Sequence, residues 1–259
     1  MSIASSEKDP SMIHESRLGT EKELNYRVAL EEYIKNSMGS NVDKMQNFSK
    51  YVPRQLLTRF ISKYELFKKV LHVQGSIVEC GVFLGGGLMT WAQLSAIFEP
   101  VNHQRKIIGF DTFSGFEELS EEDKTGKSLF SQKGGLAADS YEDLKKCIKI
   151  YDANRFINHI EKVKLVKGDV KVSMPKYLQD NLHTVVSLLY LDFDVFEPTK
   201  VAIENLLPRM PKGAIIAFDE LNVDGWPGEV LAVLKTIGIN NLRIQRFPFD
   251  SLLSYAVIE

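Results

Sequence analysis

From residue 76 onward, short apolar runs rich in β-branched residues alternate with stretches of helical periodicity. Apolar runs of this kind predict buried strands, and the longer amphipathic stretches predict helices. The predicted strands cover residues 76–80, 106–111, 162–169, 185–193, 213–220, 242–249 and 252–259. Between the first five lie helical stretches such as LMTWAQLSAIF, SYEDLKKCIKIY and PTKVAIENLLPRM. This alternation predicts an α/β fold with a doubly wound, mostly parallel sheet.

The last two predicted strands differ from the others. Only PFDS separates them, which is too short for a crossover helix, so we expect them to pair as an antiparallel hairpin. Parallel strands followed by an antiparallel C-terminal strand form a Rossmann-like architecture that resembles the sheet of class I S-adenosylmethionine-dependent methyltransferases.

The first 75 residues do not follow the alternation. EKELNYRVALEEYIKNSM and PRQLLTRFISKYELFKKVL have the spacing of amphipathic helices and are joined by the polar stretch GSNVDKMQNF. We therefore predict an N-terminal helical extension at residues 1–75 and a ligand-binding domain at residues 76–259. The extension either caps the ligand or builds a dimer contact, or it only covers one edge of the sheet, and the pattern leaves these alternatives open.

Composition and charge narrow the class of partner. The 259 residues are 44% hydrophobic, and 32 Lys and Arg face 34 Asp and Glu, for a net charge of −2. Such a balance lacks the basic patch of a nucleic-acid or anionic-membrane protein, so a small-molecule partner is favoured. The two cysteines, Cys80 and Cys147, do not suggest a disulfide framework. The polar N-terminus lacks a signal-peptide core, and no apolar run approaches a membrane span, so we expect a cytoplasmic protein.

Four glycines follow the first predicted strand in VECGVFLGGG. A strand that runs into glycines and then a helix brings backbone N–H groups close to a nucleotide-like ligand. The spacing is Gly-x-x-x-Gly, without the first Gly-x-Gly of the dinucleotide fingerprint and without the Gly-Lys-Ser/Thr of a phosphate loop. The ligand therefore need not carry a phosphate at this position.

Acidic residues follow five successive predicted strands, where ligands of open α/β sheets bind. They are Glu79, Asp111, Asp169, Asp192, Asp194, Asp219 and Glu220. Two unit charges about 4 Å apart repel by roughly 4 kcal/mol at an effective dielectric constant of about 20. Asp192, Asp219 and Glu220 can therefore converge only around a proton, a Lys or Arg, or a cation. Oxygen ligands favour Mg²⁺, with Mn²⁺ or Ca²⁺ possible, unless Asp219 caps the next segment and Glu220 points to water.

Six motifs together resemble one family. VECGVFLGGG, FDTFSGF, KGDV, LDFDVFEPT, FDEL and WPGEVLAV occur in the order and spacing of the macrocin O-methyltransferase family (TylF type), from about residue 52 to the C-terminus. The resemblance implies an S-adenosylmethionine- and Mg²⁺-dependent O-methyltransferase that acts on a hydroxyl of a sugar or other natural-product acceptor. It also implies that the glycines hold the methionine end of S-adenosylmethionine, which carries no phosphate.

The same resemblance assigns roles to individual residues. The implied cofactor-binding residues are Glu79, Gly81 and Gly85 for the methionine part, Asp111, Thr112, Ser114 and Gly115 for the ribose and its loop, and Asp169 and Val170 for the adenine. The implied metal ligands are Asp192, Asp219 and Glu220. Asp194 is the implied general base. The implied catalytic residues are therefore Asp194 and the metal ligand Asp192.

Three positions depart from the family pattern. Glu220 stands where family members usually have a second Asp, and Phe193 stands where a glycine is common and so narrows the acceptor pocket. The loop GKSLFSQKGGLAAD lacks the histidine base of some members, although it contains Lys127 and Lys133. The preceding charge run EELSEEDK is expected to be a solvated loop.

Two other functions remain open. An NAD(P)-dependent oxidoreductase is opposed by the glycine spacing and by the C-terminal hairpin. A non-catalytic S-adenosylmethionine-binding assembly protein is opposed by the retention of every strand-end carboxylate. In each case the amphipathic N-terminal helices lead us to expect a homodimer or higher homo-oligomer.

Overall fold

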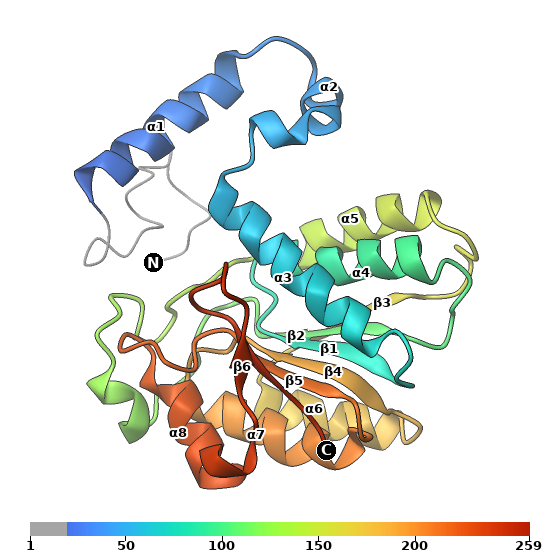
Figure 1. Ribbon diagram of the computed structural model, residues 1–259, viewed down its shortest axis with the longest axis vertical. Coiled ribbons are helices and arrows are strands. Elements are labelled where there is room, and N and C mark those ends of the chain that lie inside the picture. Colours follow the sequence, from blue (N-terminus) through green and yellow to red (C-terminus); the bar gives the residue numbers. More distant parts are fainter. Residues whose placement is uncertain (1–19) are drawn as a thin grey trace. The chain divides into compact units, whose positions relative to one another are not determined.

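The computed structural model describes residues 20–259 (Figure 1). The helices are α1 (Glu21–Asn36), α2 (Asn41–Gln46), α3 (Arg54–Val70), α4 (Gly86–Phe98), α5 (Tyr141–Ala153), α6 (Val170–Asp180), α7 (Phe196–Leu206) and α8 (Pro227–Thr236). The short 3₁₀ helices are η2 (Phe48–Lys50), η3 (Glu121–Thr125), η4 (Leu207–Arg209) and η5 (Ile239–Asn241). The strands are β1 (Ser76–Cys80), β2 (Ile107–Asp111), β3 (Val163–Lys167), β4 (Val186–Leu191), β5 (Ile215–Phe218), β6 (Gln245–Arg246) and β7 (Ser254–Val257).

The chain divides into two compact units, one that ends at Arg59 and one that spans Phe60–Glu259. The division between residues 1–75 and 76–259 stays a prediction, and residues 1–19 lie outside the described part of the chain. None of the helices within residues 20–259 combines the length and the apolar character that crossing a membrane requires.

Capping boxes begin the two helices of the N-terminal unit. Thr20 Oγ1 accepts from the Glu23 N–H at 3.3 Å, and the Glu23 carboxylate accepts from the Thr20 N–H at 2.8 Å, which starts α1. Ser40 and Asp43 form the same pair at the start of α2. The sequence pattern predicted only a polar connection where α2 lies. This helix, Asn41–Gln46, is too short to show a helical period of apolar residues.

The second unit is built on a seven-stranded sheet with the strand order β3-β2-β1-β4-β5-β7-β6. Strands β1 to β5 are parallel, whereas β7 is antiparallel to both β5 and β6. The predicted α/β fold with an antiparallel C-terminal strand is therefore confirmed. The hairpin strands are shorter than predicted, because Asp250 holds the turn between them by accepting from the Leu252 and Leu253 N–H groups.

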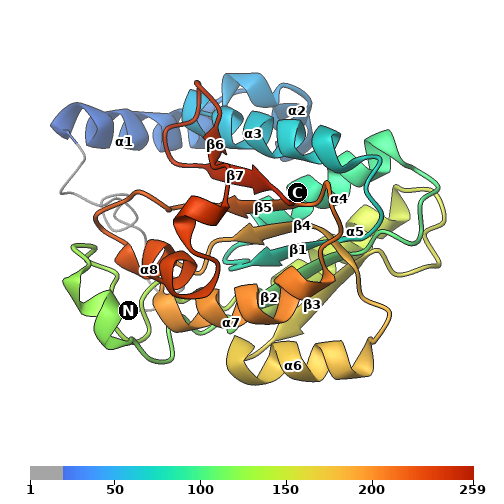
Figure 2. The same cartoon turned by 60° about the horizontal axis from the view of Figure 1, so that its bottom comes forward.

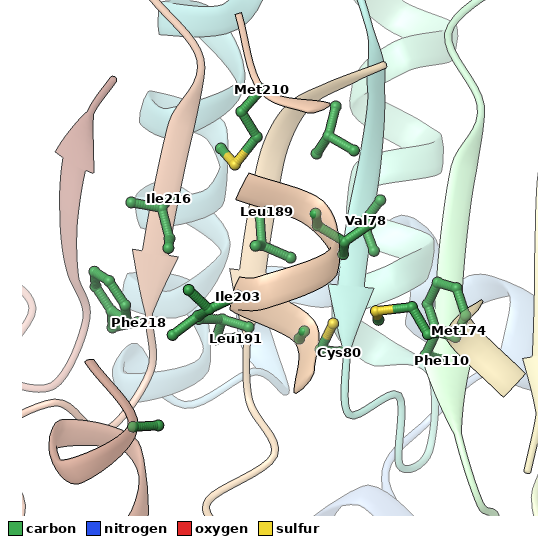
Figure 3. Close-up of a cluster of buried hydrophobic side chains, with 14 of the residues drawn as sticks. Val78, Cys80, Phe110, Met174, Leu189, Leu191, Ile203, Met210, Ile216 and Phe218 are labelled. Atoms are coloured by element: carbon green, nitrogen blue, oxygen red, sulfur yellow. The ribbon is translucent and has the colours of Figure 1, made fainter. Parts of the chain in front are cut away.

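Helices cover both faces of this sheet. Helices α6, α7 and α8 lie on one face, and α4, α5 and the part of α3 that belongs to the second unit lie on the other (Figures 1 and 2). Alternate residues of each strand enter the two cores, as the strand period requires. Val78 and Leu189 pack on the α6–α7 side (Figure 3), whereas Ile77 and Leu188 pack on the α4 side.

The strand order reverses between β1 and β4. From β1 the chain winds outward through β2 and β3, and then it returns to β4 on the other side of β1. Parallel strands end at the same edge of the sheet, and a ligand binds most readily where the winding reverses. We call this edge, where β1 to β5 end, the carboxyl edge.

Candidate active site

The glycine segment at the end of β1 allows three elements to meet. Gly81 and Gly85 have φ of 92° and 86°, values that favour glycine. A Cβ at Gly81 would overlap the carbonyl oxygen of Asp192 and lie 2.7 Å from its carbonyl carbon. A Cβ at Gly85, the N-cap of α4, would overlap the side chain of Leu144 on α5. The first glycine therefore lets β1 approach the end of β4, and the second lets α5 pack on the start of α4.

Asp111, at the end of β2, holds this segment in place. Its Oδ2 accepts from the Val82 and Phe83 N–H groups at 2.7 and 2.8 Å, and its Oδ1 accepts from the Phe113 N–H at 2.6 Å. Phe83 and Phe113 both have positive φ, 50° and 58°. A carboxylate has roughly four acceptor positions, so Asp111 keeps capacity for a ligand hydroxyl beside the glycine segment.

The loop after Asp111 is internally hydrogen-bonded. Thr112 Oγ1 donates to the Gly115 carbonyl at 2.8 Å and accepts from the Ser114 N–H at 3.2 Å. Gly115 has φ 82°, and a Cβ there would lie 2.5 Å from the carbonyl oxygen of Gly135. The predicted ribose loop thus forms one tight turn, which packs against a later loop.

The carboxylates of Glu79, on β1, and of Asp169 both lie at helix starts. Glu79 is 2% exposed, and a Cβ at Gly87 would overlap its Oε1, so the carboxylate lies against the first turn of α4, where the helix dipole favours negative charge. Asp169 is the N-cap of α6 and accepts from the Lys171 N–H at 2.9 Å. The Val170 side chain is buried in the core beneath α6, which leaves its backbone at the carboxyl edge.

Asp192 and Asp194 follow β4. The Asp192 N–H donates to the Cys80 carbonyl at 2.8 Å, which ties it to β1. Asp194 is buried and has φ 62°. The Val195 N–H donates to the Phe193 carbonyl at 2.7 Å, which closes a tight turn with Asp194 at its centre. A non-glycine residue held in so tight a turn costs on the order of 1–3 kcal/mol, and such strain clusters at functional sites.

Asp219 and Glu220 follow β5 and are held by different neighbours. Asp219 is 5% exposed, and its Oδ1 accepts from the Tyr190 hydroxyl. The Glu220 N–H donates to the Oε2 of Glu229, in the first turn of α8, at 2.9 Å. The two neighbouring acids are therefore anchored by separate elements.

Glu229 is a site residue that the sequence analysis missed. It is 1% exposed, and its Oε1 is buried without a hydrogen-bond partner within residues 20–259. Burial raises the pKa of the Glu229 carboxyl well above its usual range. The nearby charges of Asp194, Asp192 and Glu220 raise it further. The structure thus gathers these three predicted acids around a fourth, whose only signal in the sequence is its place after Trp-Pro-Gly at a helix start.

These acids offer the type of ligand atom that a divalent cation prefers. Carboxylate oxygens suit Mg²⁺, and several acids in one place need a positive partner. Within the described part of the chain, however, no three His, Cys, Asp or Glu side chains are arranged to hold a metal ion. Coordination by Asp192, Asp219 and Glu220 would require their side chains to rotate toward a common point.

The charge run after β2 is solvated at Glu117, Glu118, Glu121 and Lys124, as its composition predicted, but it is buried at Asp123. Asp123 is 3% exposed, and its Oδ1 accepts from the Phe196 N–H at the start of α7 at 2.8 Å. Glu122 accepts from Lys235 of α8 at 2.5 Å, and this bond lowers the pKa of Glu122 to about 2. The prediction failed for Asp123 because its partner lies 73 residues away in the chain.

The same loop also reaches the segment after β5. Lys127 Nζ lies 3.1 Å from a carboxylate oxygen of Asp224, and the rings of Phe116 and Trp226 meet edge to face with centroids 5.7 Å apart. The loop that borders the predicted ribose site therefore also borders the acidic cluster.

Comparisons with known proteins show the family of the chain. The sequence model described as macrocin-O-methyltransferase (TylF) matches residues 57–233. The crystal structure of the calicheamicin methyltransferase CalS11 is similar, with a TM-score of 0.89 and 32% identity over 98% of this chain and 97% of that one. An apo structure of CalS11, described as a TDP-rhamnose 3'-O-methyltransferase, gives a TM-score of 0.80 at 32% identity, over 92% of this chain and 95% of that one.

A curated relative is more distant. Demethyldecarbamoylnovobiocin O-methyltransferase of Streptomyces niveus is 24% identical over 151 residues, which are 58% of this chain and 53% of the relative. The match thus spans about half the length of that relative.

The approach of β1 to β4 predicts a large effect of Gly81→Ala. The new methyl group would overlap the Asp192 backbone, so we expect the free energy of unfolding to fall by about 3 kcal/mol or more. Gly86→Ala is the matched control, because a Cβ there meets nothing within 4 Å, and its unfolding free energy should stay within about 1 kcal/mol of the parent. Urea unfolding measures both, and equal stabilities for the two variants would contradict the packing described.

Proposed function

We propose that this chain, which belongs to the macrocin-O-methyltransferase (TylF) family, transfers a methyl group from S-adenosylmethionine to a hydroxyl of a small-molecule acceptor. The observation that carries the proposal is the family match over residues 57–233, which includes the whole carboxyl edge with its glycine segment and strand-end acids. The match favours a methyltransferase over the oxidoreductase considered from the sequence.

A sugar hydroxyl is the acceptor that the similar proteins support best. One is described as a TDP-rhamnose 3'-O-methyltransferase and another as an O-methyltransferase of demethyldecarbamoylnovobiocin. We infer a sugar or another natural product as the acceptor class, bound beside the acidic cluster under the loop that carries Phe116 and Lys127.

The cofactor would occupy the side of the carboxyl edge formed by β1, β2 and β3. The methionine part lies at Glu79, Gly81 and Gly85, the ribose at Asp111 with the Thr112–Gly115 turn, and the adenine at Asp169 and Val170. Asp111 supports this placement, because its carboxylate accepts from the Val82 and Phe83 N–H groups of the glycine segment and keeps acceptor capacity for a ligand hydroxyl.

In the transfer, an acceptor oxygen attacks the methyl carbon. The new C–O bond forms as the C–S bond breaks, and the sulfur keeps the electron pair, which yields S-adenosylhomocysteine. Asp194, fixed in its tight turn, takes the hydroxyl proton. Asp192, Asp219 and Glu220 would hold Mg²⁺, and the ion, when bound, would lower the pKa of the acceptor hydroxyl.

The first test is ligand-dependent thermal stability. S-adenosylhomocysteine at about 100 times its Kd should add roughly 2.7 kcal/mol of stability, or about 5 to 10 °C in Tm, whereas NADH should add nothing. Asp111→Ala should lose most of this shift, because both the ribose acceptor and the anchor of the glycine segment are removed. Asp180→Ala, an exposed acid paired with Lys176, is the control that should keep it. Stabilisation by NADH alone would reject the methyltransferase.

A second test separates metal binding from proton transfer. Asp192→Asn and Asp219→Asn should require far more Mg²⁺ for methyl transfer while they keep the S-adenosylhomocysteine shift. Asp194→Asn should keep the Mg²⁺ requirement and lose roughly 10² to 10⁴ in rate, the usual contribution of a general base. Initial rates against Mg²⁺ concentration distinguish the two classes of variant. Full activity in EDTA would reject the metal, and an unimpaired Asp194→Asn would reject the base.

The exposed apolar side chains of α1 support a homodimer or larger assembly. Tyr26, Val28 and Tyr33 are 49%, 47% and 45% exposed, and exposed apolar residues that form a patch mark an interaction site. Light scattering at micromolar concentration should give at least twice the chain mass of 29.4 kDa. Deletion of the first 40 residues should lower the number of chains in the assembly. A monomeric full-length chain would refute the assembly.

A further inference from the structure

Residues 116–135, which follow the turn of the proposed ribose site, form a closed loop that we call the strap. Its two ends are joined, because the Phe116 N–H donates to the Gly135 carbonyl at 3.2 Å and the Gly134 N–H donates to the Phe116 carbonyl at 2.8 Å. Its middle, η3, packs against α8, and the strap, drawn in green, lies beside that helix in both views (Figures 1 and 2). The strap therefore connects the cofactor side of the carboxyl edge to the helices that follow β4 and β5.

Asp123, on η3, binds the strap to α7. Its Oδ2 accepts from the Ser120 N–H and hydroxyl at 2.9 and 2.8 Å, and its Oδ1 accepts from the Phe196 N–H at 2.8 Å. The carboxylate is buried, so a donor that lost this partner would not find water in its place. A Cβ at Gly228, in the first turn of α8, would overlap both Asp123 Oδ1 and the Phe196 nitrogen. The strap, α7 and α8 are thus packed closely around one acid.

The helix that Asp123 caps starts directly after the proposed base. Phe196 is the first residue of α7 and follows Asp194 and Val195. A first-turn N–H has no partner within its own helix, and the N-cap residue, Val195, makes no side-chain cap bond. The cap comes instead from the strap, and the negative charge of Asp123 also suits the N-terminal end of the helix dipole. When the bond between Asp123 and Phe196 opens, the start of α7 beside the base is released.

We propose that Asp123 is a positioning residue that couples the cofactor side of the site to the acceptor side, since a cofactor at the ribose turn holds the strap and the strap holds the start of α7. The inference rests on the proposed function. The turn and the strap are in contact, because a Cβ at Gly115 would lie 2.5 Å from the Gly135 carbonyl oxygen. A ligand that orders the turn therefore also restricts the base of the strap. In this arrangement the cofactor binds first and sets the position of α7 for the acceptor.

Hydrogen exchange of the Phe196 amide reports how often its bond to Asp123 opens. In the full-length protein, saturation with S-adenosylhomocysteine should slow this exchange by at least about fivefold, the lower end of the usual coupling between two linked sites. Coupling is reciprocal, so Asp123→Ala, which abolishes the bond, should raise the Kd of S-adenosylhomocysteine by that same factor. Titration calorimetry measures the Kd.

Thr199→Val is the matched control. It changes the same turn of α7 by removing the hydroxyl that donates to the Val195 carbonyl at 2.8 Å, and it leaves the Asp123 carboxylate in place. Thr199→Val should therefore keep both the Kd and the slower exchange at Phe196. If Asp123 were only a structural cap, Asp123→Ala would lower Tm and leave the Kd unchanged, and that result would overturn the coupling.

The remaining outcomes separate this inference from the proposed function. A parent protein that binds S-adenosylhomocysteine without slower exchange at Phe196 overturns the coupling and leaves the cofactor proposal standing. A parent protein that does not bind S-adenosylhomocysteine overturns both. If Asp123→Ala does not fold, Asp123→Asn decides, because an amide accepts on one side only and leaves the N–H of either Ser120 or Phe196 facing another donor. This variant should also raise the Kd, and an unchanged Kd would overturn the inference.

Discussion

The close approach of β1 and β4 at their carboxyl ends is the constraint on which the candidate site depends. Gly81 lies against the carbonyl of Asp192, and the Asp192 N–H in turn donates to Cys80. A side chain at Gly81 would push the two strands apart where the winding of the sheet reverses. Because they stay together, the glycine segment and the acids after β4 lie side by side at the carboxyl edge, where the proposed cofactor and acceptor would be within reach of each other.

The carboxyl edge is strongly acidic, and three of its buried acids are held by three different kinds of contact. Glu79 lies at the start of α4, Asp219 accepts from Tyr190, and Glu229 accepts from a backbone N–H. The negative potential is evident at Cys80, where burial raises the pKa of the thiol and the charges of Glu79 and Asp192 raise it further. An edge of this kind suits a cationic ligand, and the sulfonium of S-adenosylmethionine would be attracted to it.

The loop after β2 connects the two halves of the proposed site. It begins at the ribose turn, and through Asp123 it caps α7, the helix that starts directly after Asp194 and Val195. A helix N-terminus left without a partner costs roughly 1 kcal/mol, so the cap favours one position of both loop and helix. The position of the proposed base thereby depends on a residue from the cofactor side of the molecule.

The sequence by itself predicted the fold class, the antiparallel pairing of the C-terminal hairpin and the acids that end the strands, whereas the place of β7 between β5 and β6 came from the structure. Apolar period, glycine spacing and turn length are local properties, and in an α/β sheet they also specify which edge carries the ligand. Only the tertiary structure decided which acids are buried and what holds them. Tyr190 and Asp219 are 29 residues apart in the chain and Asp123 and Phe196 are 73 apart, and nothing in the spacing of these residues encodes their contact. Such pairs form when packed elements bring two polar groups together out of water, where each must find a partner.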